Sequence, residues 1–290
     1  MIYLDSFTFP DEDWEWEARL REKRTCYNTE YPMGVLSGAG LTRLDFAPVT
    51  ILYGGNGSGK TTALNVIAAH LNIPRDTPCN SSTFFAGYAA ACHAVLAEPL
   101  PAESRVIASD DVFDYMLNLR SLNAGIDQER ERLFAEHAYA RHSVLQVRSL
   151  ADYDELKRRN SARRKTQSAY VREQLGGNVR ELSNGESAIF YFRQRVQEDA
   201  LYLLDEPENS LSASRQRELA AFLEESARYA GCQLIIATHS PFLLAIAQAK
   251  VYDLDARPAA VRPWTELETV RVYADFFREH RADFDAPFRR

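Results

Sequence analysis

A glycine-rich segment at residues 54–61 constrains this chain more than any other feature. It follows the pattern G-x-x-x-x-G-K-T and consists of Gly54, Gly55, Asn56, Gly57, Ser58, Gly59, Lys60 and Thr61. The apolar run 49–53 before it predicts a buried strand, and residues 62–71 after it predict a helix. Glycines let successive N–H groups turn towards an anion, and the helix N-terminus adds unpaired donors. We therefore expect a phosphate-binding loop (P-loop); a loop that only turns a strand into a helix is the alternative.

The two residues that end this pattern have distinct predicted roles. Lys60 supplies a mobile cation for the β and γ phosphates of a nucleoside triphosphate, and the hydroxyl of Thr61 is a ligand for Mg²⁺. The backbone of residues 54–61 and Thr62 complete the predicted nucleotide-binding set.

Bulk composition indicates a globular protein that does not cross a membrane. The chain has 290 residues and a formal net charge of −7, which gives no general attraction to nucleic acid or anionic lipid. No apolar run approaches the roughly 20 residues that a membrane helix needs, and the first residues do not read as a signal peptide. The four cysteines are scattered without a C-x-x-C pair, so we expect a cytoplasmic protein.

The remaining pattern is α/β with one interruption. Residues 1–53 are predicted to be rich in strands, with strand-like alternation at 2–9 and 41–46. The stretch 83–100 is alanine-rich and predicts helix, and the acidic stretch 11–17 predicts a loop or short helix. Further strands are expected at 105–108, 200–204, 233–237 and 250–254, and further helices at 214–229, 241–248 and 273–280. The polar, charged stretch 111–175 predicts a helical insertion within a single domain of residues 1–290.

Two carboxylates end the apolar strand 200–204. Asp205 at the strand end is placed to hold the water shell of a Mg²⁺ ion. Side chains alternate along a strand, so Glu206 is expected on the other side of the chain, where it can polarise a water molecule against a γ-phosphate. An ordinary pair of surface acids is the alternative.

A third segment, Leu182-Ser183-Asn184-Gly185-Glu186, precedes a helical run. Here the chain resembles the ATP-binding-cassette (ABC) ATPases, whose signature motif reads L-S-G-G-Q. Asn184 replaces the first Gly and Glu186 replaces the Gln, whereas Ser183 and Gly185 match. The resemblance implies an α/β P-loop NTPase core of the ABC type with an N-terminal antiparallel β portion. It also implies that residues 183–186 act in trans on the ATP of a second protomer in an ATP-dependent homodimer. Ser183 as a plain helix N-cap is the alternative.

The same resemblance assigns two further segments. In ABC ATPases a histidine after the next strand contacts the γ-phosphate and steadies the attacking water, which implies a catalytic role for His239 beside Glu206. A lone histidine after a strand is otherwise usually structural. Residues 208–212 occupy the position of the family's D-loop, which crosses the dimer interface, although the usual Asp of that loop is not evident.

One element of the transporter-type ABC pattern is missing. No Gln occurs between Lys60 and Gln128, and the expected position holds Ser109-Asp110-Asp111. Two roles are open for these acids: contact of one of them with Mg²⁺ through a water molecule, or capping of a helix that begins near Val112. The missing Gln argues against a transporter subunit and favours the non-transporter SMC, RecF and OLD-like group of ATPases.

The segment 157–165 is strongly basic within an acidic chain. It can neutralise phosphates of DNA or RNA, contact a partner protein, or form a solvated surface. We therefore expect an ATPase with ATP and Mg²⁺ as cofactors that acts on nucleic acid in repair or defence. The alternatives are an ATP-driven switch that regulates an effector protein and, third, the nucleotide-binding subunit of a transporter.

Overall fold

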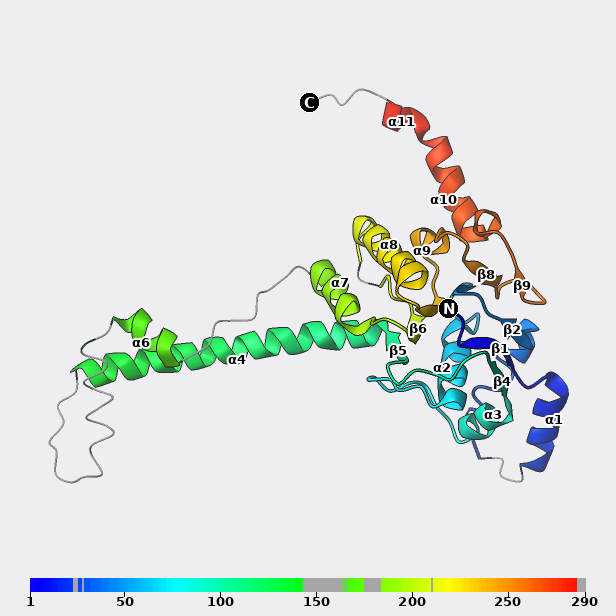
Figure 1. Ribbon diagram of the computed structural model, residues 1–290, viewed down its shortest axis with the longest axis horizontal. Helices are drawn as coiled ribbons and strands as arrows, with labels where there is room; N and C mark the ends of the chain where they lie inside the picture. Colours follow the sequence, from blue (N-terminus) through cyan, green and yellow to red (C-terminus); the bar gives the residue numbers. More distant parts are fainter. Residues whose placement is uncertain are drawn as a thin grey trace. The chain divides into compact units, whose positions relative to one another are not determined.

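The computed structural model describes residues 1–22, 26–27, 29–142, 164, 166–174, 184–209 and 211–285 (Figure 1). The chain divides into two compact units. The first unit comprises Met1–Val112 and Asn184–Arg290, and the second comprises Phe113–Ser183.

A mixed sheet of six strands forms the centre of the first unit. Its order is β5 (Arg105–Ala108), β6 (Leu201–Asp205), β7 (Gln233–Ala237), β3 (Val49–Tyr53), β8 (Lys250–Asp253) and β9 (Ala260–Val261). All neighbouring pairs are parallel except β8 with β9. Every residue of β3 and β7 is buried, as expected for central strands of a parallel sheet covered on both faces. The predicted α/β fold class is therefore confirmed.

A second sheet is antiparallel and has the order β2 (Arg43–Asp45), β1 (Leu4–Thr8) and β4 (His93–Leu96). It confirms the expected N-terminal antiparallel portion. The prediction of helix across 83–100 was wrong in part, because α3 covers only Phe85–Ala91 before the chain enters β4. Backbone pairing with β1 outweighs the helix propensity of the alanines there.

The first helix of this unit begins at a residue that caps it. The acidic stretch after Asp11 is a helix, because the Asp11 carboxylate accepts a hydrogen bond from Trp14 N at 2.8 Å and caps it. The helices are α1 (Glu12–Arg21), α2 (Lys60–Leu71), α3, α7 (Asn184–Arg195), α8 (Ala213–Tyr229), α9 (Pro241–Leu244), α10 (Glu268–Glu279) and α11 (Arg281–Asp285), with 3₁₀ turns at Ser37–Ala39 and Trp264–Glu266.

Helix α2 joins the two sheets into one hydrophobic core. Its residues Leu64 and Ile67 belong to the same buried cluster as Phe7 of β1, Leu203 of β6 and Ile235 of β7. Helices α7, α8 and α9 lie together on one side of the main sheet in Figure 1. The helix that follows the P-loop is therefore held in position by apolar packing on more than one side.

The second unit is helical in its described residues. Helix α4 (Ser109–His142) begins in the first unit and supplies most of the described residues of the second, and α6 covers Gln167–Gln174. Leu133 of α4 packs against Tyr170 and Val171 of α6, and Tyr170 OH donates to Glu136 Oε1 at 3.0 Å. No helix in the described part of the chain is both long and apolar enough to span a bilayer.

One buried side chain links the antiparallel sheet to the main sheet. Gln233, at the start of β7, is fully buried. Its Oε1 accepts hydrogen bonds from Tyr3 N and Leu4 N, both at 2.8 Å, and its Nε2 donates to Leu4 O at 2.8 Å. The amide thereby gives hydrogen-bond partners to three backbone groups at the N-terminal strand that are buried away from water.

We expect Gln233→Leu to lower the free energy of unfolding. Leucine has a similar size but leaves two buried N–H groups and one carbonyl without their partner, at roughly 1–3 kcal/mol each. The loss should therefore be at least about 3 kcal/mol in a denaturant titration. Gln194→Leu, at an exposed position of α7, is the control and should change stability by less than about 0.5 kcal/mol. Equal stability of the two variants would contradict this role.

Candidate functional site

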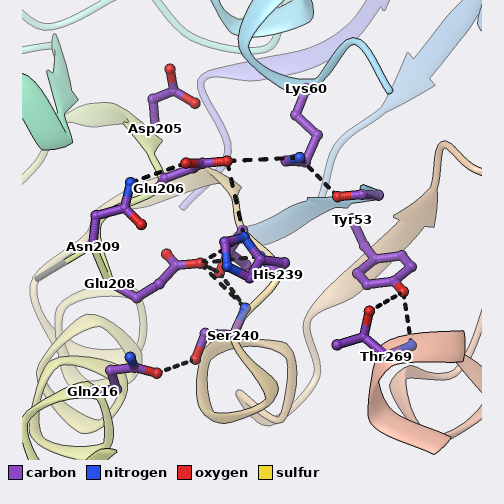
Figure 2. Close-up of polar contacts among 12 residues, drawn as sticks. Tyr53, Lys60, Asp205, Glu206, Glu208, Asn209, Gln216, His239, Ser240 and Thr269 are labelled. Carbon is purple, nitrogen blue, oxygen red and sulfur yellow. Dashed lines mark hydrogen bonds and ion pairs between the residues drawn. The ribbon is translucent and has the colours of Figure 1, made fainter. Parts of the chain in front are cut away.

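The predicted chemical groups gather at one edge of the main sheet because β3, β6 and β7 run parallel. The P-loop follows β3, Asp205 and Glu206 end β6, and His239 follows β7. The carboxyl ends of parallel strands are the usual location of ligand sites in α/β folds. Figure 2 shows Lys60, Glu206 and His239 converging there from separate elements.

The P-loop has the backbone form that its glycines predict. Gly57 has φ +83° and Gly59 has φ +98°, which are left-handed conformations that other residues adopt at a cost. A Cβ at Gly59 would also lie 3.1 Å from Leu36 Cδ2 and 3.3 Å from Val35 Cγ1. Gly59 is the N-cap of α2, whose first turn contains no acidic residue, so its free N–H groups suit an anion.

A cavity of about 300 Å³ lies against this loop. Its lining consists of Val35, Asn56, Gly57, Gly59, Lys60, Thr61, Thr62 and Glu206. The ammonium group of Lys60 is buried, donates to Gly54 O at 2.8 Å and Gly55 O at 3.0 Å, and lies 3.8 Å from Glu206 Oε1. A buried cation and a turn of free N–H groups together favour a polyphosphate ligand.

Thr61 and Asp205 meet at the cavity as expected for a Mg²⁺ site. Thr61 Oγ1 donates to Asp205 Oδ1 at 2.9 Å. Burial, with a smaller contribution from the charge of Glu206, raises the pKa of Asp205 to about 6. The nearby cations therefore do not compensate the buried carboxylate fully. Two hard oxygen donors and an undercompensated negative charge fit Mg²⁺, which prefers such ligands.

Glu206 departs from the expected alternation along β6. Its φ is +47°, so the chain leaves the extended conformation directly after Asp205 and both carboxylates reach the P-loop side. The Glu206 carboxylate accepts from Asn209 Nδ2 at 3.0 Å and faces Lys60 (Figure 2). The expectation that Glu206 points to the other side of the chain from Asp205 was wrong for this reason. A left-handed non-glycine residue of this kind is common at functional sites.

His239 is placed between two carboxylates. Its Nδ1 lies 4.0 Å from Glu206 Oε1 and 3.7 Å from Glu208 Oε1, and half of the side chain is exposed. Glu208 is buried and binds the backbone of residues 239 and 240. The position of His239 next to Glu206 allows both side chains to act on one phosphate or water, but this catalytic role remains a prediction.

The acids at 110–111 have different environments. Asp111 is buried, and its carboxylate accepts from Ala108 N at 2.7 Å and Thr77 N at 3.0 Å. Asp110 is exposed in the first turn of α4. Of the two alternatives for these acids, the contacts of Asp111 favour capping, because it satisfies a free N–H group at the start of α4.

The signature segment is described only from Asn184 onward. Ser183 lies outside the described residues, and so does the basic segment 157–165 except for Arg164. Asn184, Gly185 and Glu186 form the first turn of α7, where Glu186 Oε1 accepts from Arg215 Nη2 at 3.1 Å. None of these three residues is among those that line the P-loop cavity.

Sequence reasoning missed several contacts around the P-loop. Asp255, after β8, accepts a hydrogen bond from Gly55 N at 2.8 Å. Tyr31 OH donates to Thr62 Oγ1 at 3.3 Å, and Val35 lines the cavity. These residues lie in irregular segments far from the motif in sequence, and no spacing pattern singles them out.

One protein-family model matches a part of the chain that contributes to this site. Residues 178–245 match a protein-family model described as "AAA domain, putative AbiEii toxin, Type IV TA system". The matched stretch includes Asp205, Glu206 and His239, and it ends before β8. A search of the curated proteins found no match.

Three solved structures resemble the chain at low identity. One is "An inward-facing conformation of a putative metal-chelate type ABC transporter" (16% identity, 81% of this chain and 80% of that chain, TM-score 0.38). The second is an Smc head domain from Pyrococcus furiosus bound to the C-terminal domain of ScpA (13%, 82% and 95%, 0.40). The third is the ATP-binding cassette MJ0796 as a post-hydrolysis dimer with ADP and Pi (14%, 72% and 83%, 0.33). Likenesses at this level transfer no function.

We expect the stability of the nucleotide-free protein to depend on pH through Asp205. Its folded pKa of about 6 exceeds the ordinary value of 3.8, so the folded state holds this proton more tightly than the unfolded chain. The free energy of unfolding should therefore fall as the pH rises from about 4 to about 7, by on the order of 2 kcal/mol relative to Asp205→Asn. Denaturant titrations of both proteins without Mg²⁺ test this. Parallel pH curves for the two proteins would contradict it.

Proposed function

We propose that this chain is an ABC-type P-loop ATPase that binds ATP with Mg²⁺ and hydrolyses it to ADP and phosphate. The observation that carries the proposal is the position of Glu206. Its carboxylate lines the P-loop cavity within 3.8 Å of the Lys60 ammonium group, so a base and a phosphate-binding cation face the same space.

Each site residue has a chemical role in this reaction. The N–H groups at the start of α2 and the Lys60 ammonium group bind the phosphates. Thr61 and Asp205 hold Mg²⁺, which neutralises charge on the β and γ phosphates when it is bound. Glu206 orients a water molecule and accepts its proton while the oxygen of that water attacks the γ-phosphorus. The bond between the γ-phosphorus and the bridging oxygen then breaks, and ADP leaves with that oxygen. His239 supports the water or the γ-phosphate from the end of β7.

The proposed active unit is a homodimer. The cavity is lined on one side by the P-loop and Glu206, and residues 184–186 of the same chain do not contribute to its lining. In the proposal, the signature segment 183–186 of one protomer covers the ATP held by its partner. Charge-assisted hydrogen bonds to phosphate contribute roughly 1.5–3 kcal/mol each, so a few of them made only with ATP shift a monomer–dimer equilibrium strongly.

We expect Glu206→Gln to keep ATP binding but slow hydrolysis by about 100-fold or more, because glutamine cannot accept the proton. The unhydrolysed ATP should then hold the dimer together. ADP release and mass in solution with and without ATP measure both effects. Lys60→Ala provides the contrast, since it should lose roughly 10- to 100-fold in nucleotide affinity. Normal turnover in Glu206→Gln would refute the catalytic role. Glu225→Gln, at an exposed position of α8, is the control for the charge change.

We further propose that the ATPase cycle acts on nucleic acid in repair or defence. The support is the segment 157–165, which carries six basic residues (Lys157, Arg158, Arg159, Arg163, Arg164 and Lys165) in a chain of net charge −7. Such a concentration of positive charge in an acidic protein suits phosphate contacts. The alternative is a switch that regulates an effector protein through the same segment.

Replacement of these six residues by serine separates the two functions. If they contact phosphates, binding to duplex DNA or to RNA should weaken and become less dependent on salt, because fewer counterions are released. Titrations at several salt concentrations, with ATPase rates measured with and without DNA, test this. Unchanged binding would remove the nucleic-acid function. A co-purified protein lost with the same replacement would favour the effector switch.

A further inference from the structure

Glu208 is a buried carboxylate in the turn between β6 and α8. Its side chain is only 3% exposed, which is rare for an ionisable residue. Its Oε1 accepts three hydrogen bonds from the loop after β7: from Thr238 Oγ1 at 2.5 Å, from His239 N at 3.1 Å and from Ser240 N at 3.2 Å. One oxygen atom therefore holds the whole segment 238–240 (Figure 2).

The other oxygen of this carboxylate has no partner. Within the described part of the chain, Glu208 Oε2 is buried and receives no hydrogen bond. Among the described residues, the ring of His239 lies close to Glu208, with its Nδ1 at 3.7 Å from Oε1. Buried carboxylate oxygens are costly to leave without donors, so the position of this carboxylate calls for a further reason.

Holding a loop does not by itself require a buried charge. A neutral amide can accept hydrogen bonds from this loop, as Gln216 Oε1 does from the side-chain hydroxyl of Ser240 (Oγ) at 2.8 Å. A carboxylate carries a desolvation cost that the neutral groups avoid. The position of the His239 ring beside it indicates a use for the charge, because a carboxylate favours a proton on the ring nitrogen that it faces.

We propose that Glu208 is a positioning residue for ATP hydrolysis: it keeps a proton on His239 Nδ1, so that Nε2 faces the γ-phosphate. This inference rests on the proposed function. Glu208 touches neither substrate nor water in it and acts only through His239. Glu206, whose Oε1 is 4.0 Å from the same Nδ1, then remains available to orient the water molecule and accept its proton.

Glu208→Gln tests the role of the charge while preserving side-chain size. The amide oxygen can still accept from the loop, but it lacks the negative charge that favours a proton on Nδ1. We expect ¹⁵N NMR of the histidine rings to show His239 shifted towards the Nε2–H tautomer, with His239→Ala used for assignment. We also expect kcat to fall about 10-fold or more with KM for ATP nearly unchanged. Glu208→Asp, which keeps the charge, should recover part of kcat.

A double mutant separates positioning from a plain structural role. If Glu208 acts through His239, adding Glu208→Gln to His239→Ala should lower kcat by less than about 3-fold further. The proposal would be overturned if the effects of the two substitutions on kcat multiplied in the double mutant, or if the His239 tautomer were unchanged in Glu208→Gln. Glu225→Gln on α8 is the matched control for the charge change. If the wild-type protein does not hydrolyse ATP, the proposed function fails, whereas the tautomer measurement still decides whether Glu208 orients the ring.

Discussion

The parallel pairing of β3 with β7 and of β7 with β6 determines where every candidate chemical group of this protein lies. Register places Leu52 opposite Ala237 and Asp205 opposite Ala237 as well, so the three strands end at the same level. The segments that follow them are consequently neighbours, although the P-loop is more than a hundred residues away in sequence from the segments after β6 and β7. All side chains of β3 and β7 are buried, so apolar packing on both faces of the sheet stabilises these strands.

The same edge concentrates negative charge around one buried cation. Asp205, Glu206 and Glu208 lie within four consecutive positions, and the buried ammonium group of Lys60 lies 3.8 Å from Glu206. The raised pKa of Asp205 indicates that this arrangement is undercompensated without a ligand. An added Mg²⁺ ion would relieve Asp205, and a polyphosphate would draw Lys60 away from Glu206, which would then be free to act as a base. The electrostatics of the nucleotide-free site therefore favour the ligand pair that the P-loop pattern predicts.

Much of this arrangement could be predicted because it depends on local pattern. Strand β7 could be predicted from its apolar run. The position of the P-loop could be predicted from its glycines and from the apolar strand β3 that precedes it. Strand β4 could not be predicted, since its alanine-rich surroundings favour helix and only pairing with β1 decides otherwise. The direction of Glu206 depends on a single backbone angle after β6. The position of Glu208 depends on a hydrogen bond with Thr238, 30 residues away, for which no spacing rule exists.

The turn after β6 reaches two other parts of the site through three side chains. Glu206 faces the P-loop lysine, Asn209 holds Glu206, and Glu208 holds the loop that carries His239. In an ABC-type dimer this turn belongs to the segment that resembles the D-loop, at the interface between protomers. A displacement of the turn would then change the positions of Glu206 and His239 together rather than separately. In the proposed dimer, assembly and alignment of the proposed hydrolytic groups would therefore be coupled, because the same few residues would take part in both.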